Sequence, residues 1–414
     1  MQEQSTEIGV SSSCVWDRLE DFARAHVQQF IQALLEEEVT DLLGRVKSAR
    51  RPAVDASGGY RNGYGKPRRL ALTSGTITVR RPRVRKLAER FVSRVLPLFR
   101  RRTNQVGELL PRLYLHGLAL GDFELALRGL LGEAAPLSPG SLMRLKAQWQ
   151  MEYAAWKQQR LDDLEVVYAW ADGLYVKAGL EDTKAALLVV IGALTDGRKV
   201  VLAVESGQRE SKEAWGAVLR DLRERGLRPW RCTMADGHLG IWAALAEQQP
   251  AAAEQRCWNH RILNVLDAIP MKHHTEATTL LKAMPYAETQ TTCEALRAQF
   301  SRRYRTVAPK AVERLAHDWE RLVTFYQFPR EHWRHLRTTN VVESPFAAVR
   351  LRTTAGKRYK RVESGTALIW KLLQVAERIF RRLNAPELLP AVYAGVQFVD
   401  GRKQQTVART EVAA

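Results

Sequence analysis

The order of strand-like and helix-like segments between residues 165 and 258 constrains the fold of this chain most strongly. Five short segments there have the character of strands: residues 165–171, 185–194, 199–204, 230–235 and 255–258. The Asp196-Gly197 pair between the second and the third is a typical hairpin turn. Helical segments at 211–225 and 239–247 precede the fourth and the fifth. The sequence therefore predicts a three-stranded antiparallel meander followed by two strands that alternate with helices.

This order of elements is that of a ribonuclease H-like fold, so we expect an α/β core whose first part covers residues 161–260. Residues 261–335 have a helical pattern rich in Leu, Ala and Arg, and a last helical stretch runs from about residue 343 to 383. We therefore expect an all-helical insertion at 261–335, a last part of the core at 336–390, and a C-terminal tail at 391–414.

Two Asp-Gly pairs, at residues 172–173 and 236–237, each follow a strand-like segment directly. A carboxylate at a strand end projects into a crevice, and the following glycine permits a tight exit. Two such strands side by side would bring Asp172 and Asp236 together, and their repulsion calls for a cation. Hard oxygen ligands favour Mg²⁺ or Mn²⁺, and a third carboxylate from a helix would complete a two-metal site. Asp-Gly is also a common turn, which explains either aspartate taken alone.

Glu343 is the candidate for that third carboxylate, and its spacing leaves other interpretations open. It also fits a capping box, with Asn340 at the N-cap and Glu343 three residues later. Alternatively, Ser344 is the N-cap and Pro345 the first helical residue, because a proline further inside would remove a helix hydrogen bond.

The N-terminal region is strongly basic. Residues 45–102 contain 18 Lys or Arg against only Asp55 and Glu89. They overlap the end of a helical segment at 14–49, and residues 72–80 alternate around a turn, as a hairpin does. The whole chain has 64 Lys+Arg, 45 Asp+Glu and a net charge of +19, which favours a polyanionic partner such as nucleic acid. No apolar run approaches the roughly 18 to 20 residues of a spanning helix, so a membrane partner is disfavoured.

Residues 105–160 have the pattern of three short helices, at 109–120, at 122–131 and from Ser138-Pro139 onward. With basic residues on the third, they suggest a helix-turn-helix, although such clusters are often only packing units. A basic surface can likewise be a solvated charged face. The candidate DNA contacts are Arg68, Arg69, Arg80, Arg81, Arg83, Arg85, Lys86, Arg100, Arg101, Arg102, Arg144, Lys146, Arg350 and Arg352. The corresponding expected regions are 1–55 (helical), 56–104 (basic hairpin) and 105–160 (helical, DNA-binding).

Short motifs along the chain resemble those of the Mutator-type transposases encoded by bacterial insertion sequences, which are Asp-Asp-Glu enzymes. The matching stretches are AsnGlyTyrGlyLysProArg and the hairpin (62–85), AlaAspGlyLeuTyrValLys (171–177), GluSerLysGluAlaTrp (210–215) with ArgGlyLeu (225–227), AlaAspGlyHis (235–238), CysTrpAsnHis (257–260), and LeuArgThrThrAsnValValGluSer with ValArgLeuArgThr (336–353). Their order and spacing agree from about residue 60 to 385.

The resemblance implies a ribonuclease H-like catalytic domain with a helical insertion before the glutamate. It places the metal-binding carboxylates on Asp172, Asp236 and Glu343, and the family's Cys-x-x-His element on Cys257 and His260. The 106 residues between Asp236 and Glu343 agree with such an insertion. Two departures from the family pattern are ArgIleLeuAsn after His260 and a proline directly after the glutamate motif.

Cys257 and His260 are spaced like half of a zinc site, but His273-His274 lacks ligand spacing and Cys293 stands alone. We instead expect His260 to lie near the carboxylates and to contact the reacting phosphate. Cys257 is then a small buried residue that packs the end of the strand.

The resemblance further implies an enzyme that binds terminal inverted repeats and cleaves and joins DNA strands with two Mg²⁺ (or Mn²⁺) ions. Its partners would be double-stranded transposon ends and target DNA, bound as a homodimer. With four scattered cysteines and no secretory signal, we expect the bacterial cytoplasm, with nucleoid association when DNA is bound. Two alternatives are a domesticated, inactive DNA-binding protein, which the three acids disfavour, and another ribonuclease H-like nuclease such as a junction resolvase, which needs neither the insertion nor the basic region.

Overall fold

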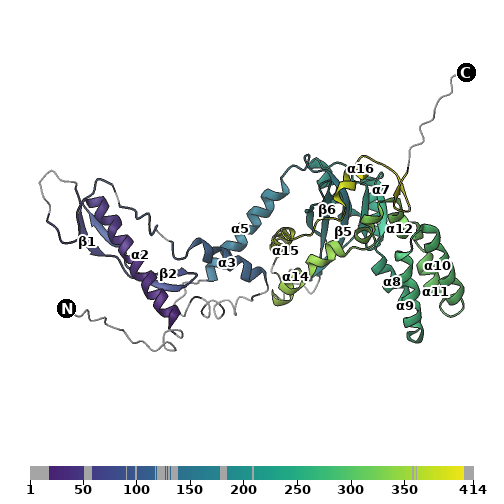
Figure 1. Cartoon of the computed structure of the whole chain (residues 1–414), viewed down its shortest axis with the longest axis horizontal. Helices are drawn as coiled ribbons and strands as arrows, with labels where there is room; N and C mark the ends of the chain where they lie inside the picture. The colour runs from purple at the N-terminus through teal and green to yellow at the C-terminus, as the bar shows by residue number, and fades with distance from the viewer. Residues whose placement is uncertain are drawn as a thin grey trace, which may run out of the picture. The chain divides into compact units, whose positions relative to one another are not determined.

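The computed structural model describes most of the chain in two compact units, residues 1–145 and 146–414 (Figure 1). The described residues are 18–50, 58–89, 91–97, 100–116, 118, 126, 128, 131, 139–177, 184–207, 209–356, 359 and 361–404. The chain passes from the first unit to the second within helix α5 (Pro139–Lys157).

The first unit packs one long helix, α2 (Leu19–Leu43), on a β-hairpin. The strands are β1 (Tyr60–Tyr64), β2 (Arg68–Leu72), β3 (Gly75–Val79) and β4 (Pro82–Arg85), paired β1 with β4 and β2 with β3. Leu35 of α2 packs with Leu70 and Ile77 of the hairpin in a small apolar core. The predicted hairpin is confirmed. The predicted helix at 14–49 is shorter, because Gly44 adopts a left-handed conformation (φ 62°) that ends it; residues 14–17 lie outside the described residues.

Glutamine side chains of α2 also form hydrogen bonds with backbone groups along the edge of the hairpin. The Gln28 side-chain oxygen accepts a hydrogen bond from the Thr78 amide at 2.9 Å. Gln32 both accepts from the Arg80 amide and donates to the Arg80 carbonyl, each at 2.9 Å. These bonds satisfy backbone groups that an isolated edge would leave exposed.

The predicted helical cluster at 105–160 is described only in part. Helix α3 (Asn104–Leu115) begins after Thr103, whose hydroxyl accepts from the Val106 amide, and α5 begins at Pro139 as expected. The predicted middle helix at 122–131 falls almost entirely outside the described residues. The helix-turn-helix therefore stays a prediction.

The second unit is built on a five-stranded mixed sheet in the order β7-β6-β5-β8-β9. Its strands are β5 (Val166–Lys177), β6 (Lys184–Leu194), β7 (Lys199–Gly207), β8 (Cys232–Ala235) and β9 (Ala253–Arg256). Strands β5, β6 and β7 form the predicted antiparallel meander, and β8 and β9 extend it in parallel. Two boundaries differ from the prediction. Asp172-Gly173 lies inside β5, because Val189 and Leu188 of β6 continue the pairing, and β9 ends before Cys257.

Helices cover both faces of this sheet. On one face α6 (Lys212–Glu224) and α7 (Leu239–Gln248) bury Trp215 and Trp242 against Ala169 and Ala171 of β5. On the other, β5 and β6 contact α14 (Asn340–Gly356), and β7 contacts α15 (Val362–Glu377). The predicted last helical stretch is thus two helices. Because side chains alternate along a strand, β5 presents Trp170 to the α14 side, where its indole donates to the His335 carbonyl.

The segment between β9 and α14 is helical, as the pattern of residues 261–335 predicts, and its role as an insertion into a ribonuclease H-like core stays a prediction (Figure 1). Its helices are α8 (Trp258–Leu266), α9 (His274–Ala283), α10 (Gln290–Tyr304), α11 (Pro309–Ala316), α12 (Trp319–Val323) and α13 (Trp333–Leu336), with 3₁₀ turns at Met271–His273, Met284–Tyr286, Thr324–Gln327 and Arg330–His332. After α15 come a turn at Pro386–Leu388, α16 (Leu389–Tyr393) and the short strands β10 (Phe398–Val399) and β11 (Arg402–Lys403). Across the described residues, every helix is too short or too polar to span a membrane.

Candidate active site

Asp172 and Asp236 are brought together by the pairing of two parallel strands. Trp170 of β5 pairs with Met234 of β8, and the same register places Asp172 level with Asp236, which follows β8 directly. Ala171 and Ala235 belong to the core under α6 and α7, so alternation turns both aspartates toward the opposite face, where α14 lies. The two carboxylates therefore converge on one face of the sheet, at the end of β8.

The electrostatics of Asp172 reflect this convergence. The pKa of Asp172 is raised from 3.8 to about 7, first by burial, then by the negative charge of Asp236 and, less strongly, of Glu343. The Gly173 amide donates to the Asp172 carboxylate at 2.8 Å and opposes the rise. Half-buried carboxylates that repel one another, with oxygen as the donor atom, fit a hard divalent cation such as Mg²⁺ or Mn²⁺.

Glu343 lies in the first turn of α14, which begins at Asn340. Thr339 precedes the helix; its carbonyl accepts from the Glu343 amide at 3.0 Å, and its hydroxyl donates to the Glu343 carboxylate. Thr339 is therefore the capping residue, and both predicted capping arrangements, with Asn340 or with Ser344 at the N-cap, are wrong. The helix continues through Pro345 to Gly356, so this departure from the family pattern does not interrupt it.

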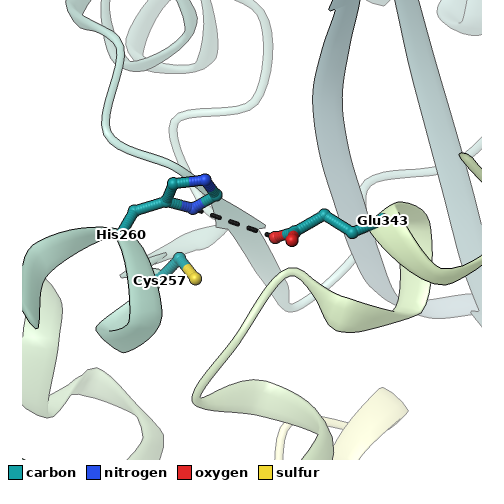
Figure 2. A group of neighbouring side chains, drawn as sticks. All are labelled: Cys257, His260 and Glu343. Carbon is teal, nitrogen blue, oxygen red and sulfur yellow. Dashed lines mark ion pairs between the residues drawn. The ribbon is translucent and has the colours of Figure 1, made fainter. Parts of the chain in front are cut away.

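Cys257 and His260 lie beside Glu343 at the start of α8 (Figure 2). The His260 Nδ1 atom is 3.8 Å from Glu343 Oε1, and Cys257 is fully buried, with the Thr339 amide donating to its sulfur at 3.4 Å. The neighbouring Cys257 sulfur, and then the negative charges of Glu343 and Asp236, outweigh burial and raise the pKa of His260 to about 9. A histidine that is cationic at neutral pH is suited to an anionic oxygen.

In the described part of the chain, one group of three potential ligands has its donor atoms within 4.8 Å of one another: Cys257, His260 and Glu343. Asp172 and Asp236 stand outside this group and are linked to it through charge. The other histidines considered for zinc lie elsewhere: His274 contacts the Ile269 carbonyl and His273 packs on Tyr304. The structure thus places His260 beside Glu343.

A family model described as "Transposase, Mutator family" matches residues 2–381. The chain belongs to the Mutator family of transposases. Its relatives include the transposase for insertion sequence element IS6120 of Mycolicibacterium smegmatis, 43% identical over 301 residues that cover 72% of this chain and 92% of the relative. The transposase for insertion sequence element IST2 of Acidithiobacillus ferrooxidans is 41% identical, over 67% of this chain and 94% of the relative. The recognised resemblance to insertion-sequence transposases is confirmed.

Among solved structures, the Drosophila P element transposase strand transfer complex matches 68% of this transposase and 83% of that chain, with a TM-score of 0.30 and 12% identity. Similarity at this level does not establish a shared fold.

The structure adds a fourth acid, Glu210, that no sequence pattern indicates. Glu210 is 6% exposed, and its carboxylate lies so close to Gly173 that a side chain there would overlap it. Burial, and then the charge of Asp236, raise the pKa of Glu210. The stretch 210–215 matches a family motif, but its spacing does not place Glu210 near Asp172. The glycine at position 173 is a signal, because a side chain there would overlap the Glu210 carboxylate.

Gly237 has the backbone conformation expected of a glycine at a tight exit from a strand. Its φ is +102°, and an added Cβ would overlap the Arg256 guanidinium, which adds positive charge near Asp236 and is ion-paired with Asp318 at 2.5 Å. Arg261, the first residue of the departure ArgIleLeuAsn, is buried and also lies 3.5 Å from Asp318. Asp318 is thus the counter-charge of both Arg256 and Arg261.

The predicted DNA contacts differ in exposure. Those that are exposed are Arg69, Arg80, Arg83, Arg85, Lys86, Arg100, Arg101, Arg144 and Arg350, and those that are half-buried are Arg68, Arg81, Arg102 and Lys146. Arg352 is only 3% exposed, so it is not retained as a surface contact. Burial and then the like charges of Arg81 and Arg101 lower the pKa of Arg68, and burial and then Arg144 lower that of Arg102. Arginines that repel one another on a surface suit a polyanion.

Proposed function

We propose that this transposase binds the terminal inverted repeats of an insertion sequence and catalyses metal-dependent strand cleavage and strand transfer on a ribonuclease H-like core. The observation that carries the proposal is the convergence of Asp172 and Asp236 on adjacent parallel strands, with Glu343 close enough to raise the pKa of Asp172. The mixed sheet order β7-β6-β5-β8-β9 and the helical segment before Glu343 support the assignment of the fold.

Asp172, Asp236 and Glu343 would hold two Mg²⁺ or Mn²⁺ ions. When bound, such ions lower the pKa of an attacking oxygen and stabilise charge on the leaving oxygen. Around them, the chain's own groups position the substrate. Thr339 orients the Glu343 carboxylate through its hydroxyl, and protonated His260 donates a hydrogen bond to a phosphate oxygen as charge builds on it.

The first unit would supply most of the DNA affinity. Arg81 and Arg101 both repel Arg68 in the free protein, and each phosphate that these arginines neutralise would release condensed counterions. Helix α5, with Arg144 and Lys146, would read base edges if the helix-turn-helix is formed. We further propose that a homodimer holds two transposon ends in the bacterial cytoplasm, associated with the nucleoid while DNA is bound.

The alternative is a domesticated relative that binds DNA without cutting it. Incubating the full chain with Mg²⁺ and a labelled duplex that carries the element's own ends separates the two. We expect cleavage by the wild type and by Glu247→Gln, an exposed carboxylate control paired with Lys212. Asp172→Asn, Asp236→Asn and Glu343→Gln should each bind the duplex without cutting it. Wild-type cleavage by any one of these three would remove that residue from the metal site, and binding without cleavage by the wild type would favour the alternative.

A further inference from the structure

A cavity of about 550 Å³ opens beside Glu343 and His260. Its walls come from the start of α8, the end of α9 with the following 3₁₀ turn, and the segment just before α14. A volume between roughly 300 and 1,000 Å³ is typical of sites for small organic groups. The cavity is larger than the metal site needs, and the mechanism above leaves most of it without a role.

Arg337 lines this cavity and has no counter-charge. Its guanidinium lies over three aromatic rings, 4.8 Å from the centre of Tyr286, 5.1 Å from Phe325 and 5.5 Å from Trp333. Among the residues that the structure describes, no carboxylate comes within ion-pair distance of it, and its buried Nε has no hydrogen-bond acceptor. A buried guanidinium N–H without an acceptor is costly, because it has lost its hydrogen bond to water. An anionic ligand in the cavity would compensate that cost.

The rim of the cavity combines a second cation with exposed apolar groups. Lys282 is exposed in the last turn of α9. Tyr286 is 74% exposed and Leu263 is 60% exposed, although both are large and apolar. A flat aromatic ring beside two cations is the combination by which proteins hold an unpaired nucleotide, since the base stacks and the phosphate is neutralised.

We propose that this cavity holds one unpaired nucleotide of the DNA strand being cut, next to the scissile phosphate. Its base stacks on Tyr286 against Leu263, and its phosphate is bound by Arg337 and Lys282. The inference rests on the proposed function, because Glu343 and His260 form the wall nearest the chemistry. Unpairing a base costs free energy, so the cavity would favour ends that are already unpaired at this position.

The test measures DNA binding by the full chain carrying Asp172→Asn, so that the substrate stays uncut. Three duplexes carry the element's own end: one fully paired, one mismatched at the base pair beside the cleavage site, and one with an abasic site there. We expect the mismatched duplex to bind more tightly than the paired one. Adding Tyr286→Ala should weaken binding to the mismatched duplex by about tenfold and leave binding to the abasic duplex unchanged.

Matched variants keep the test specific. Tyr286→Phe retains the ring and should bind as its parent does, and Met271→Ala removes an equally exposed apolar group outside the cavity. Lys282→Ala should weaken all three duplexes, whereas Lys272→Ala, an exposed lysine outside the cavity, should not. If Tyr286→Ala weakens base-containing and abasic duplexes equally, or neither, the cavity does not hold a base. That result is distinct from failure of the proposed function, which appears as absent cleavage by the wild type.

Discussion

The substitution Asp172→Asn should abolish cleavage and, in the absence of divalent cations, make the protein more stable. The pKa of Asp172 is about 7 in the folded protein against an ordinary value of 3.8. That difference of about three pH units, at about 1.36 kcal/mol each, means that ionised Asp172 destabilises the fold by up to about 4 kcal/mol. Asparagine has nearly the same shape, remains neutral and can still accept from the Gly173 amide.

The sign of the effect follows from proton binding. Between pH 3.8 and about 7 the folded protein holds a proton on Asp172 that the unfolded chain has released. Stability from this group is therefore present at low pH and is lost as pH rises through about 7. Wild type and Asp172→Asn should have similar stability near pH 4 and should diverge up to pH 8, where the cost is complete.

Thermal unfolding in a metal chelator, followed from pH 4 to pH 8, measures this divergence. At about 2 °C per kcal/mol for a domain of this size, Asp172→Asn should melt up to about 8 °C higher than wild type at pH 8. Adding Mg²⁺ should raise the melting temperature of the wild type, more at pH 8 than at pH 6, and should have little effect on the variant. Glu247→Gln, the exposed control, should follow the wild type throughout. A variant no more stable than wild type at pH 8 would refute the raised pKa of Asp172, and with it the burial and charge repulsion that cause the rise.

Three further outcomes are expected. His260→Ala should lower cleavage strongly while Cys257→Ser acts mildly through stability; equal losses, with about one zinc bound per chain after dialysis against a weak chelator, would instead establish a zinc site. Replacing both Arg68 and Arg101 by Ala should make the dependence of log K on log salt shallower by about two in a DNA-binding titration, and an unchanged slope would place the phosphates elsewhere. Gly237→Ala should lower the melting temperature by several degrees, because positive φ and overlap with a guanidinium cost about 1–3 kcal/mol each; unchanged melting would contradict the described backbone there.

The first three strands of the sheet could be predicted because the sequence features that indicate them lie within the strands and the turn between them. Apolar runs long enough for strands, separated by Asp196-Gly197, predict the meander without reference to the rest of the chain, and the structure confirms it. The end of β5 was misplaced because Asp172-Gly173 is polar and looks like an exit. The strand continues because β6 offers Val189 and Leu188 as partners, which is information from another segment.

The site itself was only partly predictable. The two aspartates stand out through their position after strands, but Glu343 could be chosen over a capping role only through the family resemblance, because 106 residues separate it from Asp236. Thr339 as the cap and Glu210 beneath Gly173 depend on contacts between distant segments. The metal-binding role of the carboxylates and the DNA contacts of the first unit stay predictions.

A set of backbone contacts around Cys257 explains how groups so far apart in sequence are held together. The Cys257 amide donates to the Ala235 carbonyl at 2.8 Å, which ties the start of α8 to the end of β8. The Trp258 amide donates to the Arg337 carbonyl at 2.9 Å, and the Thr339 amide donates to the Cys257 sulfur at 3.4 Å. The start of α8 is therefore bonded to the segment before Asp236 and to the segment before Glu343.

This junction gives the cysteine a positioning role that needs no metal and no thiolate. Asp236 follows Ala235 directly, His260 lies one turn into α8, and Glu343 lies one turn into α14, so each of these groups is about one turn or less from the junction. A small, fully buried side chain fits there because β8, α8 and the start of α14 meet with little space between them. A larger residue at position 257 would push the elements apart and separate Glu343 from Asp172, whereas serine would keep the spacing. In the Cys257–His260 pair, the cysteine is thus the joint that fixes the elements, and the histidine is placed beside Glu343.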